Sequence, residues 1–212
     1  MPSEIRPALK KRAPYSWLRA VRACVPALAP TLHLALWGLL LVPGTFLAAQ
    51  RGRPSQYDVE AVYLYQFGKF VQWPAKTESP ADAFPICVIG RDPFGAALDN
   101  TVAGESIGNL PLKPERVDNV ADARHCRILF ISPSEDARIG DILDGLQNAP
   151  VLTVSDASDF AMRGGMIQFV IQDDRVRFEI NVGPAQKAGL SLSSQLLKVA
   201  AAIRGAPAGA QP

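Results

Sequence analysis

The sequence predicts a single α/β domain with a mixed sheet flanked by helices, in which the first part is parallel and the C-terminal part is an antiparallel hairpin. Short apolar runs typical of buried strands alternate with segments of helical periodicity. Near the C-terminus, two segments of alternating polarity are joined by Asp173 and Asp174, as in a β-hairpin. A chain of 212 residues allows one such domain and an appendage.

The N-terminal segment has the order of a secretory signal peptide. A basic region precedes the apolar run of residues 34–42 (LALWGLLLV), and small residues follow at Ala48 and Ala49. We therefore expect a signal peptide over residues 1–49, cleaved near Ala49, and an exported domain. The basic region is long, which suggests that the true start codon lies further downstream. An uncleaved membrane anchor is the alternative, but the prolines of this segment would interrupt a spanning helix.

The charge of the predicted domain differs from that of the whole chain. The chain has a formal net charge of +2, but its first 50 residues hold six basic residues and one acidic residue. Residues 51–212 therefore hold 16 basic and 19 acidic residues, a net charge of −3. Nucleic-acid binding is disfavoured, because it usually requires a basic domain.

The first half of the domain is expected to form a helix, a buried strand, a short helix, an edge strand and a second buried strand, over residues 55–71, 84–90, 93–102, 110–117 and 126–132. Ser55 can cap the first helix, whose apolar residues recur at intervals of three and four: Val59, Val62, Tyr63, Phe67 and Phe70. Both buried strands are nearly all apolar. The edge strand contains Pro111 and Pro114, which cannot donate to a β-ladder.

The second half is expected to form a helix, a buried strand, the two hairpin strands and a terminal helix, over residues 134–146, 151–155, 166–172, 175–181 and 191–203. Ser134 can cap the first of these helices. The terminal helix closes the domain, which spans residues 55–203. Residues 204–212 are expected to be a flexible tail rich in Ala, Gly and Pro.

The residue inventory contains no evident catalytic centre. His125 is the only histidine outside the predicted signal peptide. Its neighbour Cys126 is expected on the opposite face of a strand, so the two side chains would not form a nucleophile and base pair. No Gly-x-Ser-x-Gly elbow is present, since the match at residues 104–108 (GESIG) lies between an expected helix and an expected strand rather than between a strand and a helix. Cys87, His125 and Cys126 lack the close spacing of a metal site. We therefore expect no enzymatic activity, no metal and no cofactor.

The cysteines are consistent with export. Of the three, Cys24 lies in the predicted signal peptide, which leaves Cys87 and Cys126 in the mature domain. An even pair in an oxidising compartment predicts a disulfide. Two separate buried thiols are the alternative.

A small-ligand crevice is predicted where parallel strands end. Residues that follow the strands at 84–90 and 151–155 should meet at one edge of the sheet: Arg91, Asp92, Phe94 and Asp156. The loop of residues 90–95 (GRDPFG) could hold an anion at the start of the next helix. However, its glycine spacing matches neither a dinucleotide motif nor a P-loop, which favours an ordinary turn.

The second hairpin strand has one ordered polar face. Arg175, Arg177, Glu179 and Asn181 alternate along it with apolar residues. This polar face is either a solvated sheet surface or a docking surface for a partner protein.

Seven segments of the domain, taken in order, resemble one family. They are YLYQFGKFVQWP (63–74), FPICVIGRDPFG (84–95), HCRILFIS (125–132), VLTVSD (151–156), GGMIQFV (164–170), VRFEINV (176–182) and AGLSLSSQLLKVA (188–200). They are similar to the YfiR (HmsC-like) family of periplasmic proteins, over nearly the whole predicted domain.

The resemblance implies a regulatory function rather than a catalytic one. Such proteins are periplasmic repressors that bind the periplasmic sensor region of a YfiN-like membrane diguanylate cyclase, and they lower cyclic di-GMP synthesis and biofilm formation. The resemblance also implies a homodimer, and it places Cys87 and Cys126 in the segments that hold the family's disulfide. Some relatives have a second cysteine pair before and within the hairpin, which this chain lacks. A redox switch by exchange between pairs is therefore not expected. A periplasmic small-ligand sensor that acts on another membrane receptor is the alternative function.

Overall fold

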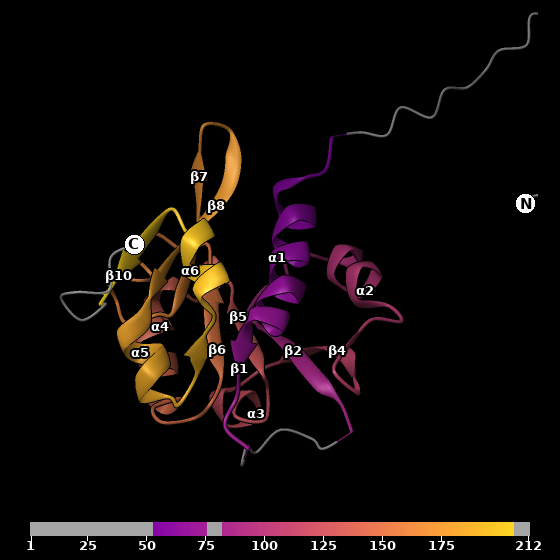
Figure 1. The fold of residues 1–212 in the computed structure, drawn as a ribbon, viewed down its shortest axis with the longest axis horizontal. Helices are drawn as coiled ribbons and strands as arrows, with labels where there is room; N and C mark the ends of the chain where they lie inside the picture. The colour runs from indigo at the N-terminus through magenta and orange to yellow at the C-terminus, as the bar shows by residue number, and fades with distance from the viewer. Residues whose placement is uncertain (1–52, 76–81, 206–212) are drawn as a thin grey trace, which may run out of the picture. The chain divides into compact units, whose positions relative to one another are not determined.

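The computed structural model describes residues 53–75 and 82–205 (Figure 1). The predicted signal peptide and most of the predicted tail lie outside the described residues. Residues Arg51–Pro212 form one compact unit. In the part of the chain that the structure describes, no helix has the length and apolar character needed to cross a membrane.

The unit is built on a sheet of eight strands in the order β10-β8-β7-β6-β5-β2-β4-β3. Its strands are β2 (Phe84–Ile89), β3 (Ser106–Ile107), β4 (Leu110–Val117), β5 (Ile128–Ile131), β6 (Leu152–Ser155), β7 (Ile167–Gln172), β8 (Arg175–Asn181) and β10 (Ala202–Arg204). A separate pair joins β1 (Val71–Gln72) to β9 (Ser191–Leu192). The helices are α1 (Gln56–Phe70), α2 (Ala96–Val102), α3 (Val120–Ala123), the 3₁₀ helix η1 (Pro133–Arg138), α4 (Ile139–Gly145), α5 (Val182–Lys187) and α6 (Ser194–Val199).

Strand pairing confirms the predicted mixed α/β fold. β4, β2, β5, β6 and β7 are mutually parallel, whereas β7 and β8 are antiparallel. β4 lies next to the edge of the sheet, where the two-residue β3 covers only its start. In the hairpin turn, Asp173 and Asp174 both have positive φ angles, 52° and 55°, as a tight two-residue turn requires.

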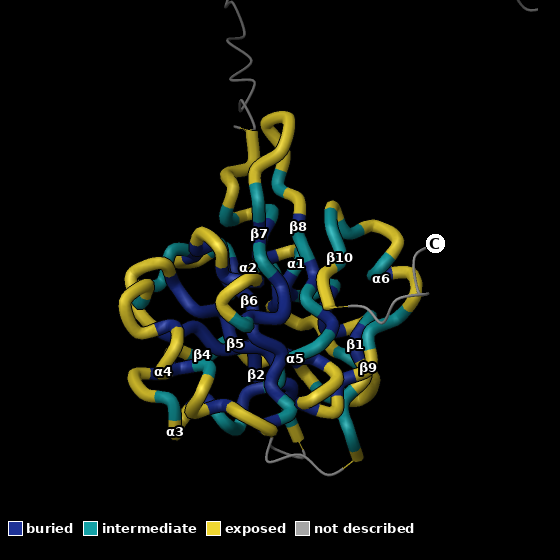
Figure 2. The backbone as a smooth tube through the Cα atoms, turned by 90° about the vertical axis from the view of Figure 1, so that its left-hand side faces the viewer, coloured by how far each residue is buried: buried dark blue, intermediate teal, exposed yellow. Residues whose placement is uncertain are grey.

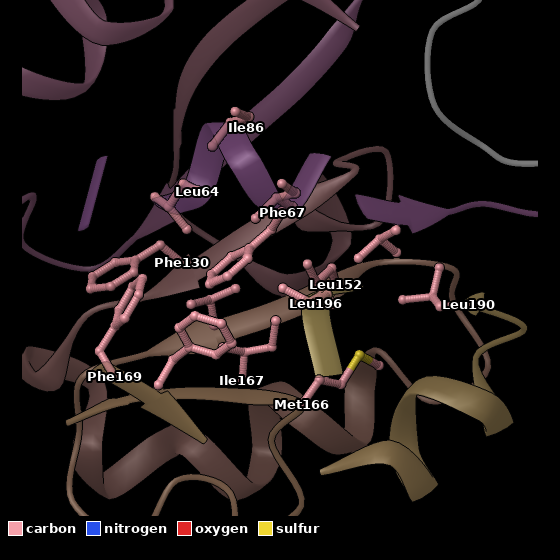
Figure 3. Packing of buried hydrophobic residues seen from close by; sticks show 14 of the residues in the cluster. Leu64, Phe67, Ile86, Phe130, Leu152, Met166, Ile167, Phe169, Leu190 and Leu196 are labelled. Atoms are coloured by element: carbon pink, nitrogen blue, oxygen red, sulfur yellow. The ribbon is translucent and has the colours of Figure 1, made fainter. Parts of the chain in front are cut away.

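The central strands are buried on both faces. On one face Ile86, Phe130 and Leu152 belong to the same cluster as Leu64 and Phe67 of α1 (Figure 3). On the other face, alternate residues of β2 and β5 pack with residues of α3 and α4, while β6 has the buried polar residues Thr153 and Ser155 there. This double burial explains why these strands are continuous apolar runs rather than alternating ones.

The first helix begins as predicted, and the face that it buries matches the predicted one only in part, with Phe67 buried and Tyr63 and Phe70 packed against the core. Ser55 and Asp58 form a reciprocal capping box at its N-terminus. Val62, which the sequence placed on the apolar face, is 46% exposed, and the buried positions are Glu60, Ala61, Leu64, Phe67 and Gly68. A Cβ at Gly68 would overlap the Ile107 side chain, so the absent side chain allows this close approach.

The helix predicted over residues 134–146 is two shorter helices. A 3₁₀ turn, η1, precedes α4, and the cap is Ser132 rather than Ser134. Pro133 follows this cap, as proline does at the first position of many helices. Ser134 instead accepts a hydrogen bond from the backbone N–H of Arg91, at 2.8 Å.

The terminal helix predicted over residues 191–203 is wrong at both ends. Ser191 and Leu192 form β9, and the helix α6 covers only Ser194–Val199. Ala202–Arg204 form β10, which pairs in parallel with β8, so Arg204 belongs to the sheet and not to the tail. The sequence analysis did not assign α5, which follows β8 directly.

Candidate functional site

The β7–β8 hairpin projects from the body of the domain (Figures 1 and 2). Aromatic contacts hold its base against α1. The Phe178 ring contacts the rings of Tyr63 and Phe67 of α1, with centroids 5.4 and 5.0 Å apart. Its tip is exposed, and Ile171 there is 56% exposed. The fold therefore presents the outer half of the hairpin on a rigid base.

The four polar residues of the predicted partner-binding face fall into two groups. Arg175 and Arg177 are exposed, and within the described ranges neither side chain has a hydrogen bond or ion pair. Glu179 instead forms an ion pair with Arg204 of β10, with 2.9 Å between Oε2 and Nη2. The Asn181 amide donates to the backbone carbonyl of Ala161, in the segment between β6 and β7, at 2.8 Å. The arginines are thus open to a partner, whereas Glu179 and Asn181 are engaged within the domain.

The predicted ligand crevice is only partly assembled. Phe94 and Asp156 both meet Tyr57 of α1, the first through ring packing at 5.7 Å and the second by accepting the Tyr57 hydroxyl at 3.1 Å. Asp92 instead forms an ion pair with Arg116, with 2.7 Å between Oδ2 and Nη2. Arg91 is exposed. The structure therefore brings two of the four predicted residues together, through a tyrosine that the sequence analysis did not assign to the crevice.

Two backbone amides of the loop of residues 90–95 are engaged within the chain. The backbone N–H of Phe94 donates to the Asp92 carboxylate at 2.8 Å, and that of Arg91 donates to Ser134. These two amides are therefore already satisfied within the chain.

Glu60 adds a second carboxyl group near Asp156, which the sequence analysis missed. It is fully buried on α1, and its Oε1 accepts a hydrogen bond from the Gln56 amide at 2.8 Å. Its Oε2 and the Asp156 Oδ1 are buried without a hydrogen-bond partner in the described structure. The signal was present, since Glu60 precedes Leu64 by four residues and Phe67 by seven, a helical interval.

Burial changes the ionisation of this cluster. It raises the pKa of Glu60 from 4.5 to about 8, because a buried carboxylate loses the water that would stabilise its charge. Burial also raises the pKa of Asp156. The pKa of Tyr57 rises to about 12, first through burial and then through the nearby Asp156 carboxylate. At neutral pH, Glu60 is therefore largely protonated.

A hollow of about 240 Å³ opens beside Asp156 and runs along β7. Its other lining residues are Gln56, Ser158, Gln168, Phe169, Val170 and Ile171. Polar groups from α1, β7 and the loop after β6 thus surround a concave surface beside the buried carboxyl pair. A small molecule with hydrogen-bond donors would fit this chemistry.

The predicted disulfide is present between Cys87 of β2 and Cys126, with their Cα atoms 6.0 Å apart. Both cysteines are fully buried. His125 lies beside them, contrary to the prediction that it would face away, because β5 begins only at Ile128 and His125 is in the preceding turn. Its Nε2 lies 2.8 Å from Glu115 Oε2. The sequence did not indicate that these three side chains lie together, because Cys87 comes from a strand 39 residues before Cys126.

Comparison with known proteins identifies one family. A family model described as YfiR/HmsC-like matches residues 57–201, well over half of the chain. Among solved structures, a conserved domain protein from Vibrio cholerae is 12% identical, with a TM-score of 0.44 over 60% of this chain and 57% of that chain. The ABC domain from Streptococcus pneumonia in complex with L-Trp is 11% identical, with a TM-score of 0.47 over 68% and 60%. The chain thus covers less than two thirds of either structure's length, and both TM-scores are below 0.5.

Proposed function

The chain belongs to the YfiR/HmsC-like family, and we propose that its domain is a non-enzymatic regulator, exported to the periplasm, that binds the periplasmic sensor region of a membrane diguanylate cyclase and represses it. Lower cyclic di-GMP and less biofilm would follow. The family match over residues 57–201 is the observation that carries this proposal. Export requires the predicted signal peptide over residues 1–49, and the disulfide fits an oxidising compartment.

The projecting hairpin is the proposed contact surface. Its root is fixed against α1, so little conformational freedom would be lost on binding. Arg175 and Arg177 stand exposed on one face of β8, and neither is engaged within the described chain. Arginine is enriched at protein interfaces because its guanidinium forms several hydrogen bonds to acidic or carbonyl groups. An acidic or carbonyl-rich surface on the cyclase would complement it.

The test is binding of residues 51–212 to the purified periplasmic regions of membrane diguanylate cyclases encoded in the same genome, by calorimetry. We expect one region to bind, and we expect Arg177→Glu to weaken that binding more than tenfold, because reversing a charge at the interface places like charges together. Lys187→Glu is the matched control, since it makes the same charge change on α5, away from the hairpin.

Two outcomes would contradict this account. If no cyclase region binds, the proposed function is wrong. If binding is strong but Arg177→Glu and Lys187→Glu behave alike, the interface lies elsewhere on the domain. We also propose that the domain is a homodimer, which light scattering on the same samples would show as twice the monomer mass.

A small-ligand sensor is the second candidate function. The observation that favours it is the pair of buried, unpartnered carboxyl oxygens on Glu60 and Asp156, of which Asp156 lines a hollow along β7. A ligand bound there would contact β7, and it would therefore be placed to change the affinity of the hairpin for a partner. Native mass spectrometry of the domain purified from the periplasm would reveal such a ligand as added mass, and its absence would count against this function.

A further inference from the structure

Three metal-ligating side chains converge on one side of the sheet. Cys87 comes from β2, while His125 and Cys126 come from the turn between α3 and β5. One ligand atom from each lies within 4.8 Å of the other two. The two sulfurs are buried, whereas the His125 side chain is 34% exposed. The cluster is therefore reachable from solvent through the imidazole.

We propose that reduction of the Cys87–Cys126 disulfide converts this cluster into a Zn²⁺ site, with both thiolates and the His125 imidazole as ligands. The site does not depend on the proposed regulatory function. In the oxidised protein the sulfurs are bonded to each other and do not bind a metal. In the reduced protein, two thiolates and one imidazole are a ligand set typical of zinc.

The distances suit a tetrahedral ion. Zinc bonds to sulfur are about 2.3 Å and to imidazole nitrogen about 2.0–2.1 Å, so ligand atoms around one zinc lie roughly 3.5–3.8 Å apart. A set already within 4.8 Å needs only small side-chain movements, chiefly separation of the two sulfurs once their bond is broken. Three protein ligands leave a fourth position for water.

Glu115 completes the arrangement as a positioning residue. It lies opposite Cys87 in the β2–β4 register, and its Oε2 is 2.8 Å from His125 Nε2. A carboxylate on one imidazole nitrogen fixes the ring and makes the other nitrogen a better ligand, as in many zinc sites. Because Nε2 is engaged with Glu115, Nδ1 is the nitrogen left for the metal.

The chemistry balances with a dithiol as the reductant. The dithiol gives two electrons and two protons to the protein disulfide, which becomes two thiols, while the dithiol becomes a disulfide. Zinc then displaces the two thiol protons. Bound zinc ties up both sulfurs, so it would slow the return to the disulfide. Hard cations such as Mg²⁺ and Ca²⁺ prefer oxygen ligands and are not expected there.

The experiment uses residues 51–212, which form a compact unit. The protein is reduced without oxygen, freed of reductant and titrated with Zn²⁺ in competition with a chromophoric chelator. We expect the reduced protein to bind one Zn²⁺ and the oxidised protein to bind none at this site. Co²⁺ in place of Zn²⁺ should give thiolate charge-transfer absorption and the visible bands of a tetrahedral ion.

Variants assign the ligands. The double variant Cys87→Ser/Cys126→Ser should bind no Zn²⁺, and His125→Ala should weaken binding at least tenfold. Glu115→Gln should weaken it about 10- to 100-fold, through the imidazole. Glu105→Gln is the matched control, since it removes an exposed carboxylate that is not part of the cluster.

Each outcome decides the proposal. A reduced protein that stays folded by circular dichroism and binds no Zn²⁺ overturns it, and so does binding that is unchanged by His125→Ala. If reduction unfolds the domain, refolding on addition of Zn²⁺ supports the site, and failure to refold overturns it. Failure of cyclase binding would leave all of these results unaffected.

Discussion

Glu60 is a residue whose burial makes the stability of the domain depend on pH. The folded-state pKa is about 8, above the ordinary value of 4.5, so the folded protein holds a proton that the unfolded chain releases. Below pH 4.5 both states are protonated and Glu60 has no effect. As the pH rises from about 4.5 to 8, the unfolded state is increasingly favoured, by at most about 1.4 kcal/mol per pH unit.

Replacing Glu60 with Gln should remove this dependence, because Gln has a similar shape and does not ionise. Relative to wild type, Glu60→Gln should gain about 3 kcal/mol in the free energy of unfolding between pH 5 and pH 8. Urea unfolding of both proteins at the two pH values measures this gain. Parallel pH curves would show that Glu60 is not held in its protonated form.

The disulfide is the second residue-scale contribution to stability. It joins residues 39 positions apart, and closing a loop of this length stabilises the folded state by up to about 4 kcal/mol on the chain-entropy estimate. Reduction in the presence of a metal chelator should therefore lower the free energy of unfolding by about 2–4 kcal/mol. Cys87→Ala/Cys126→Ala is the control, since reductant should not change its urea midpoint. Equal midpoints for oxidised and reduced wild type would be evidence against this contribution.

The sequence predicted these two features unequally. The disulfide was predictable by counting, because only two of the three cysteines lie outside the predicted signal peptide. The burial of Glu60 near Asp156 was not predictable, because Val59 and Val62 suggested a buried face of the first helix that does not include Glu60. Which of two apolar stripes is buried depends on packing against the sheet, and the small residues Ala61 and Gly68 decide it in the folded protein.

At the scale of elements, the edge strand β10 is held to β8 partly by the Glu179–Arg204 ion pair. The pair is partly exposed, so it should contribute roughly 1 kcal/mol or less. Glu179→Arg should lower the free energy of unfolding, measured by urea denaturation, by an amount of this size. Adding Arg204→Glu should restore it, because the swap re-forms an ion pair. A double variant no more stable than the single one would exclude this role of the pair.

The same contact explains why the hairpin face was only partly predictable. Alternation along β8 correctly predicted one apolar and one polar face. The pattern treated its four polar residues alike, because Arg204, the partner of Glu179, lies in a segment that was expected to be a flexible tail. A strand of three residues such as β10 has no periodic signal of its own, and pairing with β8 determines its conformation. The buried central strands and the hairpin turn were predicted well, since composition and turn chemistry specify them locally.

At the scale of the whole molecule, the domain combines a parallel sheet whose central strands are buried with one exposed hairpin. Buried cores on both sides of the sheet make the body rigid. The candidate functional features lie at two places on it. The arginine face and the carboxyl cluster lie at the hairpin and its base, whereas the disulfide lies on the α3 and α4 face. A regulator of this design would bind its partner through the hairpin and respond to small molecules at the base.

Repression of a diguanylate cyclase by the exported chain is the central claim of the proposed function. The most direct test is the cyclic di-GMP content of cells that lack the gene, measured by mass spectrometry and compared with cells complemented by the full chain or by the chain without residues 2–49. We predict that the deletion raises cyclic di-GMP several-fold, that the full chain restores the original level, and that the shortened chain does not. An unchanged level after deletion, or equal restoration by the shortened chain, would contradict the proposed function.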